Sequence, residues 1–331
     1  MHATLGVEKA GGAPTGLHGF IAWAQPFRMP DFFLISGLFL AARIDRPWSQ
    51  YLDTKVLHFA YFYVVWFNIQ FLLRAPGLIG ETGLEATLAL YLSKYVQPFG
   101  TLWFIYQLAV FFVAAKLVRR ITPPLVLAAA VGLHVLAPAT GSIVIDEFTD
   151  RFVYFYTGYA AASLVLGYAA MLQRWPVAPI AVALVVWAAL NWLAVDSGIA
   201  ALHGPDLVFG SIGIAAVIAS SVLLARGPLG SGIAYCGRHS IAIYLAFTLF
   251  MAPVRSLLLR ALGAQSADII AVIVACASIG GALLLQRLLV DTPLRALFVR
   301  PGWCRLGARP PQRAASSIVQ RLGPRVLPAK V

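Results

Sequence analysis

The chain has 331 residues, of which 60% are hydrophobic and only 11% are charged. A soluble domain carries about 25% charged residues, so this chain cannot cover the surface of a soluble globule and must have lipid as its main solvent. The composition argues against cytosolic enzymes, disulfide-stapled secreted domains and DNA-binding modules, although the net charge of +12 would otherwise suggest nucleic acid.

Apolar segments of membrane-helix length follow one another along the chain. A helix needs about 20 mostly apolar residues to cross a hydrocarbon core of about 30 Å. Nine segments meet this requirement, the fourth being the shortest: 26–43, 56–74, 99–118, 123–139, 152–172, 177–195, 206–225, 239–260 and 268–290. The sequence therefore predicts an all-α fold, a polytopic membrane helix bundle with nine transmembrane helices, in a membrane domain over residues 1–295.

The basic residues predict the orientation of this bundle. When successive loops are assigned to alternate sides, most of the 25 Lys and Arg residues fall on one side, together with the C-terminal tail 296–331. Cytoplasmic loops are the ones that carry an excess of Lys and Arg. We therefore expect the tail to be cytoplasmic, where its charge sets the topology and contacts anionic lipid headgroups, without a nucleic-acid partner.

The first apolar segment contains polar residues, which are costly in lipid and therefore candidates for function. Arg28 and Asp31 are three positions apart on one helix face, so they could form a structural ion pair or belong to a site. Ser36 and Gly37 are a small pair that would let two helices approach closely.

Further polar and aromatic candidates lie at the predicted membrane interface. Lys55 and His58 are i, i+3 neighbours that would face the same way, as a snorkelling anchor or as a cationic patch for a phosphate-bearing ligand. Arg238 opens the eighth segment, where it either binds an anion or marks an ordinary positive helix start. Trp103 is typical of an interfacial aromatic belt or of a ligand contact, and His134 is interpreted as structural.

Three motifs resemble the acyltransferase-3 family of integral-membrane acyltransferases, which includes fucose 4-O-acetylase-like proteins. The first, residues 27–39 (FRMPDFFLISGLF), is similar to the family's MP-x-FF-x-x-SG-F block. The second, residues 101–106 (TLWFIY), is similar to its LWFL segment, and the third, residues 237–245 (GRHSIAIYL), to its G-x-x-S-x-x-IYL segment. The motifs occur in family order and extend over almost the whole chain.

The resemblance implies ten core helices, an acyl-CoA donor on the cytoplasmic side of a bacterial inner membrane, and O-acylation of a glycan or another hydroxyl compound. It also implies a catalytic histidine in the first helix, preceded by Arg or Lys eleven positions earlier. The helix before the first motif is absent here, but His2 stands at its expected distal part. We therefore expect Met1 to be internal to a longer protein and His2 to be the general base.

The resemblance gives the other candidates supporting roles. Lys55, His58 and Arg238 would bind the phosphates of the donor, whereas Arg28, Asp31, Ser36 and Trp103 would shape the site. Acyl-CoA, most simply acetyl-CoA, enters as a co-substrate, with no bound cofactor and no metal. The chain departs from the family in two places. The family commonly has basic residues, usually arginines, after its second helix, and Lys55 and His58 stand in that region here. Phe247 stands where the IYL segment of the family often ends in histidine.

Two other classes of protein compete with this interpretation. A secondary transporter or exporter of a polar metabolite should show paired half-repeats with helices broken at matching positions, and the sequence shows no such repeats. A purely structural or sensory membrane protein would not need His2, Lys55 and His58. An acyltransferase accounts for these residues most directly.

Overall fold

The computed structural model describes residues 1–12 and 15–306, and this part of the chain is helical without strands. The elements in chain order are α1 (His2–Gly11), α2 (His18–Leu38), α3 (Trp48–Tyr51), η1 (Leu52–Val56), α4 (Leu57–Thr82), α5 (Leu84–Ser93), η2 (Gly100–Leu102), α6 (Trp103–Leu117), η3 (Val118–Arg120), α7 (Pro123–Leu136), α8 (Ile143–Ala160), α9 (Ala162–Arg174), α10 (Val177–Asp196), η4 (Ile199–Ala201), α11 (Pro205–Arg226), α12 (Gly230–Arg238), α13 (Ser240–Leu262), η5 (Ala264–Ser266), α14 (Ala267–Leu289), η6 (Pro293–Leu297) and η7 (Gly302–Cys304). The all-α prediction is confirmed for these residues.

Each of the nine predicted segments overlaps a helix, but the count of nine spans is not confirmed. Six helical segments within residues 1–12 and 15–306 are long and apolar enough to cross a membrane: Trp48–Thr82, Gly100–Arg120, α10, α11, α13 and α14. The pair α8 and α9 could form a seventh, although it bends by 72°. Helix α7 has only 14 residues, which is about 21 Å at 1.5 Å per residue and short of a full crossing.

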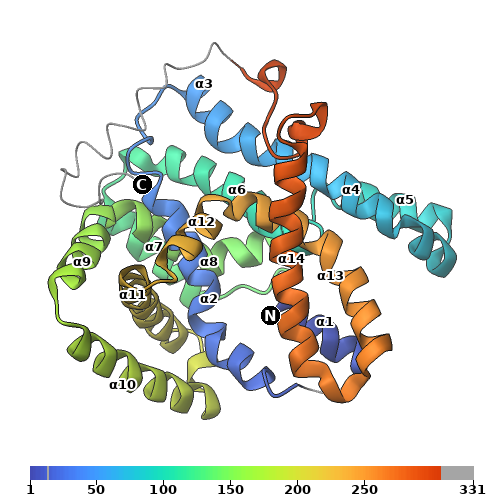
Figure 1. Cartoon of the computed structure of the whole chain (residues 1–331). Helices are drawn as coiled ribbons and strands as arrows, with labels where there is room; N and C mark the ends of the chain where they lie inside the picture. The colour runs from blue at the N-terminus through green and yellow to red at the C-terminus, as the bar shows by residue number, and fades with distance from the viewer. Residues whose placement is uncertain (13–14, 307–331) are drawn as a thin grey trace.

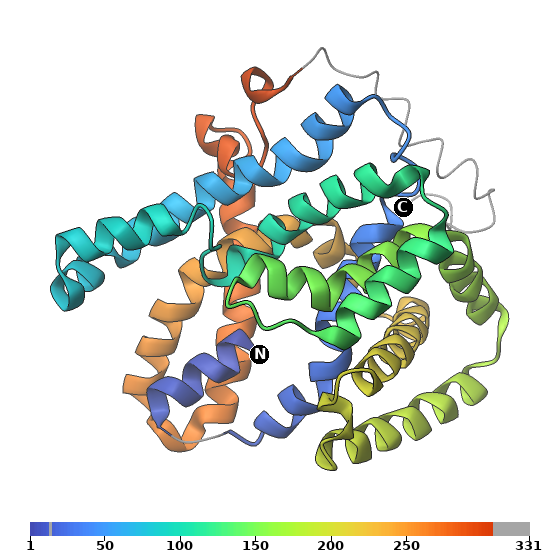
Figure 2. The same ribbon diagram turned by 180° about the vertical axis from the view of Figure 1, so that it is seen from behind.

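The helices pack in two groups that α4 and α6 connect (Figures 1 and 2). On one side, α13 lies along α14, and α1 packs against both. On the other side, α2 contacts α8 and α11. The largest buried clusters are rich in aromatic residues, and Phe33 of α2 meets Phe104 and Phe111 of α6 at ring-centroid distances of 4.9 and 5.0 Å. These aromatic contacts join the first sequence motif to α6, the helix that begins within the second motif.

Two glycines allow α2 and α8 to cross in direct backbone contact. A Cβ atom at Gly37 would collide with the carbonyl oxygen of Phe155, and one at Gly158 would collide with the carbonyl oxygen of Leu34. Close approach of this kind requires small residues at the interface. The predicted packing role of the Ser36–Gly37 pair is therefore confirmed for Gly37.

Replacement of Gly37 by Ala is expected to destabilise the protein by about 2 kcal/mol, because backbone atoms cannot move aside as a flexible side chain can. The loss is measured as a lower midpoint of thermal unfolding in detergent. Gly167→Ala on α9 is the matched control, since a Cβ at Gly167 meets no atom within 4 Å and Ala favours helix. Equal stability of the two variants would contradict the crossing described above.

Contacts between loops agree with the predicted alternation of sides. Buried Lys116 donates hydrogen bonds to the carbonyl oxygens of Ile44 and Arg46, and Arg300 pairs with Asp53 at 2.8 Å. All five residues fall on the side that is rich in Lys and Arg. On the other side, Asp268 accepts hydrogen bonds from the backbone N–H groups of residues 16 and 17. That the basic side is cytoplasmic stays a prediction.

The tail predicted over 296–331 is only partly within the described residues. Its first part, up to Leu306, folds back through η6 and η7 onto η1 and α4, with Tyr61 donating to the carbonyl oxygen of Ala296 and Trp66 to that of Leu297, both at 2.8 Å. This part is therefore a packed segment. The remaining tail arginines, from Arg309 onward, lie outside the described residues.

Candidate functional site

His2 lies at the start of α1, among helices that are distant from it in sequence. Ala3 and Val7 are buried against α14 and fix α1 in place. The imidazole of His2 is 5.8 Å from the ring of Phe247 on α13, measured between centroids. Arg28 of α2 is close enough for its charge to act on this imidazole. The structure thus places the predicted base beside α13, two residues beyond the end of the third motif.

The other predicted residues of α2 do not pair with each other. Arg28 and Asp31 form no ion pair in the described part of the chain, so the structural ion pair that their spacing allowed is not formed. The hydroxyl group of Ser36 donates a hydrogen bond to the carbonyl oxygen of Phe32, at 2.8 Å. Arg28 and Asp31 are both partly buried, which leaves them as polar groups inside the helix assembly.

Trp103 and Arg238 are placed apart from each other. Trp103 is partly buried and packs on the ring of Phe33, with centroids 6.0 Å apart. Arg238 is exposed at the end of the short helix α12, next to His239, whose Nδ1 bonds to the carbonyl oxygen of Tyr235. Neither residue lines the cavity described below.

Lys55 and His58 are separated by the shape of the helix that carries them. The stretch Leu52–Val56 is a π-helical turn, which inserts extra backbone and changes the direction of the following side chains. The ammonium of Lys55 lies over the ring of Phe112, 4.4 Å from its centroid. His58 instead packs against Phe62, with ring centroids 5.0 Å apart, and faces a cavity. The common face expected from i, i+3 spacing is therefore not observed.

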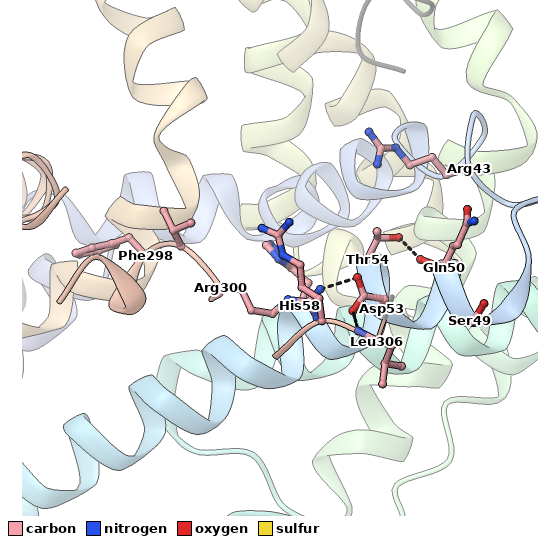
Figure 3. Close-up of a pocket in the computed structure, with 11 residues that line it drawn as sticks. Arg43, Ser49, Gln50, Asp53, Thr54, His58, Phe298, Arg300 and Leu306 are labelled. Carbon is pink, nitrogen blue, oxygen red and sulfur yellow. Dashed lines mark hydrogen bonds and ion pairs between the residues drawn. The ribbon is translucent and has the colours of Figure 1, made fainter. Parts of the chain in front are cut away.

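This cavity, of about 470 Å³, lies between the start of the long helix Trp48–Thr82 and the C-terminal segment (Figure 3). Its walls come from the turn after α2, from α3 and η1, from the first turn of α4, and from the segment that follows η6. The lining residues are Arg43, Ser49, Gln50, Asp53, Thr54, His58, Phe298, Val299, Arg300, Arg305 and Leu306.

The charge of the cavity is positive. Three arginines line it, at positions 43, 300 and 305, against the one carboxylate of Asp53. Arg43 is half-buried, and burial together with the neighbouring charge of Arg46 lowers its pKa. Lys116 fixes the turn that carries Arg43 through its bonds to the carbonyl oxygens of residues 44 and 46. A cavity with several guanidinium groups suits a multiply charged anion such as a phosphate ester.

The arginines of this cavity could not be recognised as site residues from the sequence. Arg43, Arg300 and Arg305 were interpreted only as charges that set the topology. One signal was available for Arg43, because it follows the first motif directly and the family resemblance implies basic residues after that helix. No pattern in the sequence placed residues 300–306 beside η1, since this contact joins residues about 250 positions apart.

A second polar cluster joins α7, α8 and α11. His134 is 1% exposed; its Nε2 lies 3.0 Å from a carboxylate oxygen of Asp206 and its Nδ1 lies 2.7 Å from the backbone carbonyl of Asp150. Both partners are hydrogen-bond acceptors, an arrangement that an imidazolium with a proton on each ring nitrogen satisfies. This geometry fits an ion pair that holds three helices together.

The comparison with models of known protein families agrees with the resemblance that the three sequence motifs indicated. A family model, Acyl_transf_3, described as an acyltransferase domain, matches residues 1–287. No curated protein and no solved structure matches the chain. The matched range contains His2, all three sequence motifs and the walls of the cavity that come from the turn after α2, from α3, η1 and α4, but not its C-terminal wall.

Proposed function

The chain belongs to the Acyl_transf_3 family of acyltransferases, and on this basis we propose that it is an integral-membrane O-acyltransferase that moves an acetyl group from acetyl-CoA to a hydroxyl group of a glycan or a similar acceptor. The observation that carries the proposal beyond the family is the cavity of about 470 Å³ with three arginines in its walls. We expect this cavity to face the cytoplasm of a bacterial cell, where acyl-CoA is made.

The cavity would bind the donor through its phosphates. Coenzyme A carries a diphosphate and a 3′-phosphate, and guanidinium groups bind such oxygens through paired, charge-assisted hydrogen bonds. Arg43 and Arg305 approach the cavity from different segments of the chain (the labelled Arg43 is visible in Figure 3). Lys55, which does not line the cavity but lies between the lining residues Thr54 and His58 in the chain, would add positive charge beside it. Arg238 does not line the cavity, so its predicted contact with the donor is not part of this arrangement.

His2 would supply the base for the transfer step. A sugar hydroxyl is a weak nucleophile near neutral pH, and a neutral imidazole can take its proton while the oxygen attacks the thioester carbonyl carbon. The new C–O bond forms, the C–S bond breaks, and the coenzyme A thiolate leaves and receives the proton from the imidazolium. Arg28 of α2 would stabilise the negative charge that develops on the carbonyl oxygen.

The proposal is tested with membranes that contain the protein. Incubation with acetyl-CoA labelled in the acetyl group should move label into hydroxyl-bearing material, with release of one free thiol per acetyl transferred. Membranes with an empty vector measure the background. An exporter would instead change the distribution of a solute across sealed vesicles and release no thiol. Absence of both label transfer and thiol release in the presence of a broad set of sugar acceptors would contradict the proposed activity.

A further inference from the structure

The C-terminal segment 293–306 is fixed to the cavity although it lies beyond the residues that match the family model. Asp53 of η1 uses both carboxylate oxygens to hold it: one accepts from the Arg300 guanidinium and the other from the backbone N–H of Leu306, both at 2.8 Å. Tyr61 and Trp66 of α4 hold the first part of the segment by donating to the carbonyl oxygens of Ala296 and Leu297. These hydrogen bonds therefore hold the segment in place as one wall of the cavity (Figure 3).

Arg300 is the one arginine of this wall that is buried, with 6% of its side chain exposed. Its Nη2 pairs with Asp53, but its Nη1 is buried without a hydrogen-bond partner among the described residues. A buried donor of a charged group that has no partner is costly, because it loses its hydration without compensation. Such an atom in the lining of a cavity indicates an acceptor that arrives with a ligand.

We propose that Arg300 is a donor-binding residue, and that the segment 293–306 completes the binding site for the phosphates of coenzyme A. The inference rests on the proposed function, which supplies a ligand with phosphates. Arg300 donates through Nη1 to a phosphate oxygen while Nη2 stays on Asp53. Arg305, which is exposed on the same segment, and Arg43, on the facing turn, supply the remaining positive charge.

The ion pair between Arg300 and Asp53 also has a purely structural explanation, in which it only fixes the segment. The two roles differ in what they do to donors with and without phosphates. A binding role affects coenzyme A but leaves a donor without phosphates unchanged. A structural role disturbs the whole site and affects both donors equally.

The experiment therefore uses Arg300→Gln in the full chain, purified in detergent, with two probes: tritiated coenzyme A and S-acetylpantetheine, which has no phosphate. We expect Arg300→Gln to weaken the binding of coenzyme A by about 10- to 100-fold, the loss of one charged hydrogen bond, while KM for S-acetylpantetheine in acetyl transfer stays within about twofold. Arg295→Gln is the matched control, because Arg295 is exposed on the same segment and does not line the cavity.

The outcomes separate this inference from the proposed function. If the wild type binds coenzyme A and transfers acetyl, but Arg300→Gln binds it equally well, the inference is overturned and the function stands. If Arg300→Gln weakens both probes equally, Arg300 has only the structural role and the inference is also overturned. If the wild type neither binds coenzyme A nor transfers acetyl, both the proposed function and the inference fail.

Discussion

Replacement of His2 by Ala is expected to lower the rate of acetyl transfer by about 10²- to 10⁴-fold, the range that a positioned general base contributes. The side chain is exposed at the start of α1 and makes no hydrogen bond within the described residues, so the fold does not depend on it. Initial rates with labelled acetyl-CoA at saturating donor measure the effect. The loss should appear in kcat, because the base acts in the transition state and does not hold the donor.

A matched substitution on the same helix controls for damage to α1. Lys9 is exposed at the other end of this helix, and Lys9→Ala should keep the rate of the wild type. His2→Gln keeps a polar side chain of similar size but cannot accept and return a proton, so it should be as impaired as His2→Ala. Transfer by either His2 variant at near the wild-type rate would rule out His2 as the base.

The positions of most helices could be predicted from apolar length alone. The predicted segments 177–195 and 206–225 match α10 and α11 within about one residue at either end, because long, mostly apolar runs with polar or Gly/Pro-containing flanks indicate where a membrane helix begins and ends. A bend within an apolar run could not be predicted in the same way, because the run itself continues through the bend. The bend between α8 and α9 falls at Ala161, and the predicted segment 152–172 contains no Pro that would have indicated it.

The composition of the site could be predicted less well than the fold, for two physical reasons. Helical spacing placed Lys55 and His58 on one face, but the π-helical turn over Leu52–Val56 changes that register and only His58 reaches the cavity. A charge count cannot distinguish arginines that set the topology from arginines that bind a ligand. The contact of Arg300 with Asp53 separates these uses, and it depends on the folded chain.

Replacement of His134 by Leu is expected to destabilise the protein by about 3 kcal/mol, since it removes one partner of a buried ion pair and leaves the other without compensation. The imidazolium contributes two hydrogen bonds, one to Asp206 of α11 and one to the backbone of α8, and thereby ties both helices to α7. At about 2 °C per kcal/mol for a large chain, the midpoint of thermal unfolding in detergent should fall by about 6 °C.

The neighbouring carboxylates allow a sharper test of this ion pair. Asp206→Asn should cost less than His134→Leu, because the amide oxygen can still accept from His134 and from the backbone N–H groups of Gly204 and Leu207. Asp150→Asn should cost least, since His134 meets the backbone carbonyl of Asp150 at 2.7 Å and its carboxylate only at 3.3 Å. His203→Leu is the control, as His203 is exposed. If His134→Leu unfolds at the same temperature as this control, the three helices are held together by their apolar contacts alone.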